Sequence, residues 1–416
     1  MELLEALERL VRIPSVSGTA AVSDALAEAL CLCEEFGFRT KNCDSRIGWA
    51  EIGESSENDL EAPLIGILCH LDVVPPGDGW QHDPYSCSVE NGRLYGRGVM
   101  DDKGPAAAAI LAMKDILDKG GPRQGRIRII FGCMEETGNW VDMEYYKSCE
   151  ELPDLGFTPD ADFPAIYGEK GIAMVDLSMK AADSGFTYIK GGEVPNMVPD
   201  WCRAVLTDGT ELSATGRAAH GSTPEDGENA ITKLMEQAAG HDCTFARFYC
   251  KAIGRRLDGS GCGCGFSDAE SGHLTFNAGC IAIEDDQVVL HADIRYPVTV
   301  TLDTVLNGLR EAVRPYGVVV ALRTSMKPVY MDPNGAVFSG LMDAYKSVTG
   351  DTESRPLVIG GGTYARAMDN IVAFGPVFPG RECTEHQKDE YILIDDLEKA
   401  RDIYRLAMEN LCMLNS

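Results

Sequence analysis

The sequence lacks several features that would place the chain in a specialised class. No apolar run approaches the ~20 residues that span a bilayer. The first residues, MELLEALERLVRIP, carry acids where a secretory signal peptide carries basic residues, so we expect neither a membrane span nor an export signal. Hydrophobic residues make up 44% and charged residues 25% of the chain, which excludes global disorder. A length of 416 residues allows two or three domains.

Basic residues are scarce. The chain has 37 Lys and Arg against 65 Asp and Glu, so its formal net charge is −28. Nucleic acids and anionic membranes are polyanions and would repel such a chain. We therefore expect neither as a partner.

Cysteines are frequent, but no CxxC pair occurs among the fifteen. The tightest groupings, Cys31-x-Cys33 and Cys262-x-Cys264, lack the two-residue spacer of zinc knuckles and redox pairs. Without a secretory signal, the cysteines are interpreted as free thiols in a reducing compartment, which predicts a cytoplasmic protein.

The alternation of helical and strand patterns up to about residue 172 predicts an α/β domain with a parallel or mixed sheet. Residues 64–69 (LIGILC) form a short apolar run typical of a buried strand, and residues 127–131 form another. Helical patterns occupy residues 22–36 and 106–117.

Short strand patterns dominate residues 173–326, which indicates a smaller α+β domain. We expect strands at 174–179, 203–206, 288–294 and 318–322, helices at 229–239 and 303–316, and a flexible glycine-rich loop at 258–265. The α/β pattern resumes in residues 327–416, with helices at 337–348 and 395–411. The predicted architecture is one α/β domain (1–172 and 327–416) interrupted by an inserted domain (173–326).

His70 is the first candidate functional residue, because it follows the buried strand at 64–69. Ligand sites in open α/β sheets gather at the carboxyl ends of strands. In an extended His70-x-Asp72, both side chains share one face, so Asp72 can orient the imidazole. On its own, this pair would rather indicate a structural histidine.

Three acidic segments and one more histidine change that interpretation. Adjacent carboxylates at Asp101-Asp102 and at Glu135-Glu136 repel each other unless a cation or a proton joins them. For Asp102 alone, the cap of a helix N-terminus is also a sufficient role. The remaining candidates are Asp160, in a turn, and His386, before the last helix.

The set His70, Asp101, Glu136, Asp160 and His386 has the composition of a dinuclear metal site. One histidine and one carboxylate for each cation, with a shared carboxylate between them, suit two zinc-class ions about 3.5–4 Å apart. Glu135 would then face a bound water.

Nine ordered motifs along nearly the whole chain resemble the M20 metallopeptidases, in particular the dinuclear-zinc branch of PepV-type Xaa-His dipeptidases and carnosinases. They are HLDVVPPGDGW (70–80), GRLYGRGVMDDKGP (92–105), MEETGNW (134–140), LGFTPDADFP (155–164), GEKG (168–171), NMVPD (196–200), GRAAHG (216–221), GGGTYAR (360–366) and HQKDEY (386–391).

The resemblance implies a zinc-exopeptidase-like catalytic domain with an inserted lid domain, and it assigns a role to each site residue. The metal ligands are His70, Asp101, Glu136, Asp160 and His386, with Asp101 as the bridge. Asp72 orients the first histidine, Glu135 is the general base, and His220 is a lid histidine that reaches the scissile carbonyl. Asn196 and Arg366 contact the far end of the substrate. The ions are two divalent metals, zinc by preference and manganese or cobalt as alternatives.

The resemblance also implies a cis peptide bond after Asp101 and narrows the activity. Relatives that act as carboxypeptidases or desuccinylases carry Glu where this chain has Asp160, so Asp160 indicates a dipeptidase or aminopeptidase. We expect hydrolysis of dipeptides with free termini by a monomer or homodimer. Only 24 positions separate Asn196 from His220, fewer than in a monomeric PepV-type lid, so His220 could serve its own site or that of a neighbour.

Three alternatives remain at this point. An N-acyl amino acid amidohydrolase or deacylase would share every catalytic residue. A non-catalytic binding protein could retain the fold, although the intact Glu135 speaks against it. A phosphate-binding loop at residues 360–363 lacks the lysine of a P-loop. Other histidines are interpreted as surface residues (His82, His241, His273) or as structural (His291), and Arg295 as a possible support of the lid.

Overall fold

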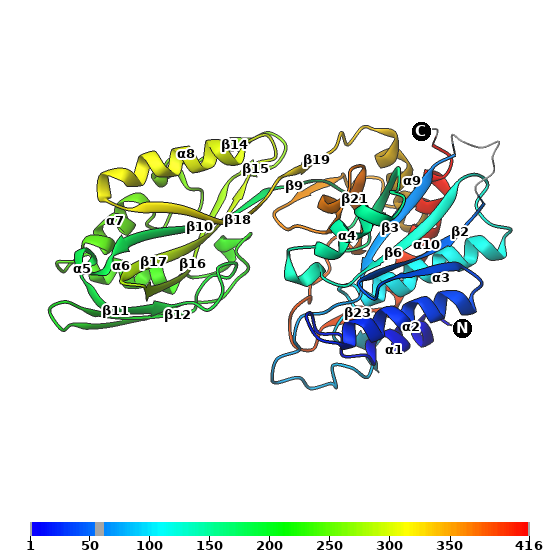
Figure 1. Ribbon diagram of the computed structural model, residues 1–416, viewed down its shortest axis with the longest axis horizontal. Coiled ribbons are helices and arrows are strands. Elements are labelled where there is room, and N and C mark those ends of the chain that lie inside the picture. The colour runs from blue at the N-terminus through cyan, green and yellow to red at the C-terminus, as the bar shows by residue number, and fades with distance from the viewer. Residues whose placement is uncertain (1, 55–61, 415–416) are drawn as a thin grey trace. The chain divides into compact units, whose positions relative to one another are not determined.

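The chain forms two compact units in the computed structural model, which describes residues 2–54 and 62–414 (Figure 1). The first unit comprises Met1–Tyr167, Met331–Leu357 and Thr363–Ser416. The second comprises Gly168–Tyr330 and Val358–Gly362. The second unit is therefore an insertion in the chain of the first.

The first unit alternates helices and strands along its sequence. Its helices are α1 (Leu3–Val11), α2 (Ala21–Glu35), α3 (Lys103–Asp118), α4 (Val141–Cys149), α9 (Ala336–Thr349) and α10 (Ile394–Leu411), with short 3-10 turns η1 (Glu135–Thr137) and η5 (Tyr364–Ala367). Its strands are β1 (Arg39–Cys43), β2 (Ile47–Ile52), β3 (Leu64–His70), β4 (Ser88–Glu90), β5 (Arg93–Tyr95), β6 (Arg126–Gly132), β7 (Leu155–Thr158), β8 (Ala161–Asp162), β21 (Ile371–Ala373), β22 (Pro376–Val377) and β23 (Tyr391–Leu393). Strands β9 (Ile166–Glu169) and β20 (Leu357–Ile359) contain points where the chain passes between the units.

The main sheet of the first unit is mixed, which confirms the predicted fold class. Its strand order is β1-β2-β6-β3-β7-β21-β9. Strand β3 pairs in parallel with both β6 and β7, and β21 is parallel to β7, whereas β1, β2 and β9 run antiparallel to their neighbours. The four parallel strands β6, β3, β7 and β21 place their carboxyl ends at one edge, where ligand sites are expected.

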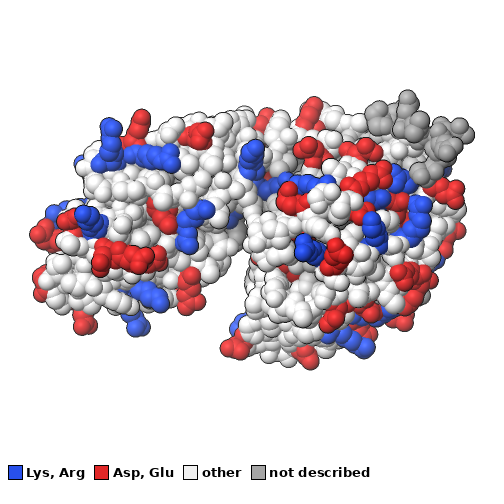
Figure 2. Space-filling model, viewed as in Figure 1, with Lys and Arg blue, Asp and Glu red and all other residues white. Residues whose placement is uncertain are grey.

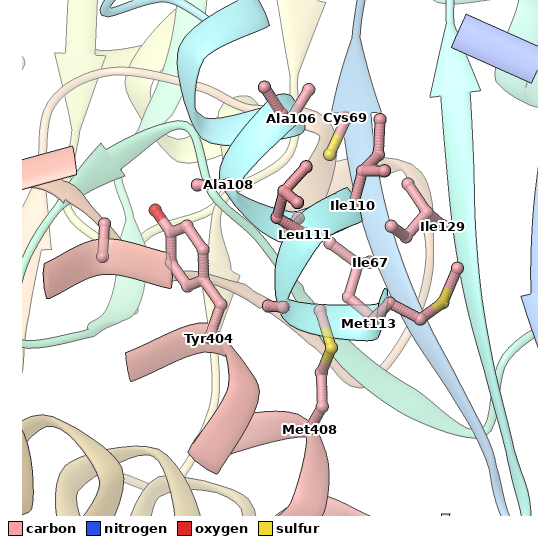
Figure 3. Close-up of a cluster of buried hydrophobic side chains, with 14 of the residues drawn as sticks. Ile67, Cys69, Ala106, Ala108, Ile110, Leu111, Met113, Ile129, Tyr404 and Met408 are labelled. Carbon is pink, nitrogen blue, oxygen red and sulfur yellow. The ribbon is translucent and has the colours of Figure 1, made fainter. Parts of the chain in front are cut away.

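Every residue of strand β3 is buried, as expected for a strand in the middle of the sheet. A continuous apolar run fits a strand that is covered on both faces. Figure 3 shows Ile67 and Cys69 beside helix α3, with Tyr404 and Met408 of α10 packed near the same helix. Four alanines in a row, 106–109, let α3 approach its neighbours closely, and all four are fully buried.

The loop before α3, which carries Asp101, is fixed by a close backbone approach. A Cβ atom on Gly104 would lie 1.9 Å from the carbonyl oxygen of Val99, so only glycine fits there. The backbone N–H of Gly104 donates to the carbonyl of Gly98 at 3.0 Å. The loop therefore closes on the first turn of α3 and presents Asp101 from a constrained backbone.

The second unit is an α+β structure built on a seven-stranded sheet of order β13-β12-β11-β16-β17-β10-β18. Its strands are β10 (Gly171–Lys180), β11 (Phe186–Gly191), β12 (Trp201–Leu206), β13 (Glu211–Thr215), β14 (Ser267–Asp268), β15 (Gly272–His273), β16 (Thr275–Glu284), β17 (Gln287–Tyr296), β18 (Val319–Met326) and β19 (Val329–Tyr330). Its helices are α5 (Ala181–Ser184), α6 (Ala230–Ala238), α7 (Thr244–Ala252) and α8 (Leu302–Val313), with 3-10 turns η2 (Pro224–Asp226), η3 (Ser260–Cys262) and η4 (Arg314–Tyr316). Residues of α6, α7 and α8 share one hydrophobic core with alternate residues of the sheet.

The glycine-rich segment 258–265 packs into this core, whereas the sequence predicts a flexible loop. Cys262 and Cys264 are both buried, and their Sγ atoms lie 3.6 Å apart. A Cβ atom on Gly263 would lie 2.4 Å from the carbonyl oxygen of Gly308 in α8. Glycine at position 263 therefore allows this segment to approach α8 closely, and the two buried thiols pack into the core next to it.

Acidic side chains are spread over both units on the face in Figure 2, with basic side chains among them. All fifteen cysteines are free thiols. Within residues 2–54 and 62–414, no helix combines the length and the apolar character needed to cross a membrane.

Candidate active site

The predicted site residues of the first unit gather at the carboxyl edge of its parallel strands. His70 is the last residue of β3, Glu135 and Glu136 form the turn η1 after β6, and Asp160 follows β7. Asp101 comes from the loop before α3, and His386 from the loop before β23. Segments distant in sequence thus meet at one edge of the sheet.

Asp101 lies between the two histidines. Its Oδ1 is 2.8 Å from Nε2 of His70, and its Oδ2 is 3.0 Å from Nε2 of His386. Glu136 approaches the same nitrogen of His386, at 3.1 Å, and Asp160 lies 3.8 Å from Nε2 of His70. The structure therefore brings all five predicted ligands together, with Asp101 in the central position.

His70 is oriented as a metal-binding histidine would be. It is buried, and its Nδ1–H donates to the backbone carbonyl of Asp72 at 2.9 Å, which turns Nε2 toward Asp101 and Asp160. Metal-binding histidines almost always donate their other ring N–H to such an acceptor. Ligand atoms of His70, Asp101 and Glu136, and also those of His70, Glu135 and Asp160, lie within 4.8 Å of one another. These nitrogen and oxygen donors fit a divalent ion of the zinc class.

The carboxylate of Asp72 contacts the turn of Glu135 and Glu136 more closely than it contacts His70. Its carboxylate lies 3.5 Å from Nδ1 of His70, farther away than its own carbonyl. The same carboxylate accepts hydrogen bonds from the backbone N–H groups of Glu135 and Glu136, at 3.1 and 3.3 Å, and from the hydroxyl of Ser17 at 2.7 Å. Asp72 thus connects the end of β3 to the turn that carries both glutamates.

Charge crowding governs the acid–base state of the carboxylates. Burial raises the pKa of Glu135 well above its ordinary value, and the nearby carboxylates of Glu136 and Asp101 raise it further. Burial, followed by the charge of Asp101, also raises the pKa of Asp160. The pKa of Asp101 falls instead, because hydrogen bonds from His386 and His70 outweigh the opposing effect of burial. A cation placed among these groups would relieve the repulsion between the carboxylates.

The same carboxylates raise the pKa of both histidines. Burial alone would lower the pKa of His386, but Asp101 and Glu136 raise it to about 12. Burial alone would also lower the pKa of His70, but Asp101 and Asp72 raise it well above its ordinary value.

Two residues that sequence reasoning did not identify fix the turn of Glu135 and Glu136 from the other side. Asp142 is buried and accepts hydrogen bonds from the backbone N–H groups of Cys133 and Met134, at 2.7 and 3.1 Å. The hydroxyl of Tyr364 donates to Asp142 at 2.7 Å. Nothing in the local sequence around Asp142 indicates this role, because it depends on a tyrosine 222 positions away.

The peptide bond between Asp101 and Asp102 is cis, as the resemblance implies. Asp102 is buried, and one of its carboxylate oxygens accepts a hydrogen bond from the backbone N–H of His70 at 3.0 Å. It therefore connects the Asp101 loop to β3.

Two of the remaining candidates, Asn196 and His220, lie together in the second unit. The backbone N–H of Gly221 donates to the carbonyl of Asn196 at 2.7 Å, and Met197 pairs with His220 in an isolated bridge. Both candidate side chains are exposed. The ring of His220 is oriented by Ser222, whose Oγ lies 2.6 Å from Nδ1.

Arg366, the last candidate, lies in the turn η5 of the first unit and is half-buried. In the second unit, the preceding glycine segment is attached to the sheet through Arg295, which donates to the carbonyl of Gly360 at 3.0 Å. Asp293 holds Arg295 with two hydrogen bonds of 2.8 Å. The expectation that Arg295 supports this unit is confirmed to that extent.

His82 and His291 make defined contacts. His291 is buried between Asp176, at 2.7 Å from its Nδ1, and Glu284, at 3.1 Å from its Nε2, which fits the structural role predicted for it. The ring of His82 stacks on Tyr95 with the centroids 3.9 Å apart.

This fold and this edge of clustered histidines and carboxylates define a metallohydrolase-like architecture, and comparisons with known proteins identify its family. Residues 66–410 match the peptidase family M20/M25/M40. The chain is 34% identical over 435 residues to the protein named "Putative dipeptidase YtjP" of Bacillus subtilis (strain 168), covering 94% of this chain and 90% of that protein. The chain belongs to the peptidase family M20/M25/M40.

Solved structures agree on the fold. Human carnosine dipeptidase 1 is 16% identical, with a TM-score of 0.68 over 99% of this chain and 96% of that one. The M20 family metallo-carboxypeptidase Sso-CP2 of Sulfolobus solfataricus is 19% identical, with a TM-score of 0.64 over 100% of both chains. These distant neighbours carry different activities in their names. They therefore support the fold of this chain but do not indicate its substrate.

Proposed function

We propose that this protein is a metal-dependent dipeptidase that hydrolyses dipeptides with free termini. The observation that carries the proposal is the position of Asp101, whose two carboxylate oxygens each face one histidine, with Glu135 and Glu136 on the adjacent turn. The dipeptide substrate is supported by the name of the Bacillus subtilis relative and by aspartate, rather than glutamate, at position 160.

Two divalent ions would be held by residues of the first unit. His70 and Asp160 would bind one ion, His386 and Glu136 the other, and Asp101 both. Zinc suits these ligands best, and manganese or cobalt are the alternatives. When bound, such ions lower the pKa of a water and polarise the substrate carbonyl.

Glu135 would serve as the general base and then as the acid. Its burial and the surrounding carboxylates raise the pKa of Glu135, which makes its deprotonated carboxylate a stronger base toward the proton of the attacking water. The same proton can pass to the leaving amine as the peptide bond breaks. Asp72 and Asp142 hold the backbone of the turn, so the carboxylate starts from a fixed position.

The remaining candidates would bind the end of the substrate and stabilise the oxyanion. We assign residues 1–172 and 327–416 to a catalytic domain and residues 173–326 to a lid domain. Arg366 of the catalytic domain and Asn196 of the lid would contact the far end of the substrate. His220 of the lid would donate to the oxyanion, from its own chain or from a partner in a homodimer. A cytoplasmic location is supported by the fifteen free thiols.

A hydrolysis screen of the purified protein tests the proposal directly. The panel contains free dipeptides, N-acetyl amino acids and N-succinyl amino acids, each with and without added Zn²⁺ or Mn²⁺. Metal-dependent cleavage confined to dipeptides is the expected result. Preferential cleavage of the N-acyl substrates would instead identify an amidohydrolase, and no cleavage of any substrate would favour a binding protein.

Removal of metal is expected to destabilise the protein. A ligand present at 100 times its Kd stabilises the folded state by about 2.7 kcal/mol. For a domain of 150–250 residues that corresponds to a Tm shift of roughly 5–10 °C. Thermal unfolding with a chelator, and after readdition of Zn²⁺, Mn²⁺ or Co²⁺, measures the shift. Equal Tm values in all four conditions would contradict a preformed metal site.

Amidation of the dipeptide C-terminus is expected to reduce kcat/KM strongly in the wild type and to have little further effect in Arg366→Ala. The planar guanidinium offers two parallel N–H donors, which match the two oxygens of a negatively charged carboxylate. An amide is neutral and has only one oxygen to accept them. Arg355→Ala, which removes an exposed arginine of the same unit, is the control and should keep the wild-type response. Equal sensitivity to amidation in Arg366→Ala and in the wild type would exclude Arg366 from the site.

A further inference from the structure

Two chain segments that carry proposed metal ligands are bound to each other by strand pairing and by side-chain contacts. One segment runs from β5 to Asp101, and the other runs from His386 to β23. Strands β5 and β23 pair antiparallel, and the backbone N–H of Gly96 donates to the carbonyl of Glu390 at 3.0 Å. The segments therefore lie side by side at the point where each approaches the site.

The carboxylate of Glu390 reaches from the His386 segment into the Asp101 loop. It accepts hydrogen bonds from the backbone N–H groups of Gly98 at 3.1 Å, Met100 at 2.9 Å and Asp101 at 3.3 Å. The side chain of Glu390 is completely buried. One carboxylate thus fixes the backbone of the loop up to Asp101 itself.

Arg97 reaches in the opposite direction, from the Asp101 loop to the His386 segment. Its Nη1 pairs with Glu390 at 2.6 Å, and its Nη2 donates to the backbone carbonyl of Gln387 at 3.2 Å. The guanidinium also lies 5.3 Å from the ring centre of Trp80, and the side chain is 2% exposed. The residue next to His386 is therefore held by the loop that carries Asp101.

Each segment therefore holds the other, and the contacts connect two proposed ligands of one ion, Asp101 and His386. Buried charged side chains are costly unless they are paired and hydrogen-bonded. The Arg97–Glu390 pair is fully buried, and nearly all of its polar groups form hydrogen bonds. His70 and Asp160, by contrast, follow strands β3 and β7, whose positions are set by the main sheet. The Arg97–Glu390 pair therefore links two of the three ligands proposed for the second ion, Asp101 and His386, but only one ligand of the first ion, Asp101.

We infer that Arg97 and Glu390 are positioning residues that hold Asp101 and His386 at the spacing required by the second metal ion, the one proposed to bind His386, Glu136 and Asp101. The inference rests on the proposed function, because it presupposes the two-ion site. The pair acts through backbone contacts and does not touch the ion or the substrate. Loss of the pair is expected to weaken binding of the second ion, which has two ligands on the linked segments, more than binding of the first ion, which has one.

The test is metal titration of Glu390→Gln, followed by competition with a chelator and by measurement of bound metal. Loss of groups that orient metal ligands typically weakens metal affinity about 10- to 100-fold. We expect a loss of that size for one of the two ions and a clearly smaller loss for the other, which shares Asp101 but keeps His70 and Asp160. In a His386→Ala background, where the second site is already lost, Glu390→Gln should weaken binding of the remaining ion only by that smaller factor.

Glu51→Gln is a matched control. Glu51 is 3% exposed and pairs with the buried Arg128 at 2.6 Å, within the β2–β6 strand pair of the same unit. It should bind both ions like the wild type. Should Glu390→Gln fail to fold by circular dichroism, Arg97→Lys, which retains the positive charge, replaces it with the same expected result.

The outcomes separate the inference from the function on which it rests. Two ions bound with wild-type affinity by the folded variant, or an equal loss in Glu51→Gln, would overturn the inference alone. Equal weakening of both ions would also overturn it, because a general structural role would then be sufficient. A wild-type protein that binds fewer than two ions would overturn the two-ion site and the inference together.

Discussion

Glu135→Gln is expected to keep both metal ions and to lose activity by a factor of about 10²–10⁴, the usual contribution of a positioned general base. Glutamine has nearly the same shape and can occupy the same turn, but it cannot accept a proton from water. The hydrogen bonds that Asp72 accepts from the turn involve backbone N–H groups and survive the substitution. Geometry is therefore preserved while the proton acceptor is removed.

Two measurements are needed for this variant, the steady-state rate on a dipeptide and the metal content of the purified protein. Glu136→Gln is the informative comparison, because its side chain lies 3.1 Å from His386 and is assigned to the metal. That variant should lose bound metal along with activity. A Glu135→Gln protein that turns over substrate at close to the wild-type rate would show that another group is the base.

His220→Ala is expected to leave fold and metal content intact while kcat falls by about 10²–10³, as for other oxyanion donors. The backbone N–H of Ser222 donates to Nδ1 of His220 at 3.3 Å, so this nitrogen is an acceptor. In a neutral ring the proton then lies on Nε2, which makes that nitrogen a hydrogen-bond donor. A donor of this kind stabilises the charge that develops on a carbonyl oxygen.

Mixing two inactive variants shows which chain supplies the histidine. His220→Ala and Glu135→Gln are combined after dissociation and reassociation of any oligomer. Regained activity means that the histidine acts across a subunit interface, and no regained activity means that it acts within its own chain. His241→Ala, a change in the same unit, should remain fully active alone. Full activity of His220→Ala would remove this histidine from catalysis.

Strands and helices with one dominant pattern could be predicted from the sequence, and those with a broken pattern could not. The apolar run at 64–69 predicted β3, and the pattern at 106–117 predicted most of α3. Strand β16 was missed because its pairing with β17 shifts between Ala278 and Cys280, which interrupts the alternation of inward and outward residues. Helix α7 was missed because its sequence, TFARFYCKA, is rich in residues of low helix propensity and its N-cap, Cys243, makes no side-chain capping bond.

The candidate ligands could be found because each lies in a motif with a chemical reason. Strand ends, paired acids and the resemblance together pointed to His70, Asp101, Glu136, Asp160 and His386, and the structure brings these five side chains together. The residues that hold the ligand loops gave no such signal. Arg97 and Glu390 are separated by 293 positions, and charged side chains are rarely fully buried, so the sequence alone favours a solvent-exposed position for both.

The order of the ligands along the chain has a consequence for biosynthesis. His70, Asp101, Glu136 and Asp160 all precede the second unit, whereas His386 follows it, 226 positions after Asp160. At roughly 5–20 residues per second, a ribosome needs about 10–45 s to translate that interval. During this time the nascent chain presents four of the five proposed metal ligands without the last histidine, and α3 without α10, which packs against it in the finished protein (Figure 3). Complete loading of the proposed metal site is therefore expected to follow translation of the last quarter of the chain.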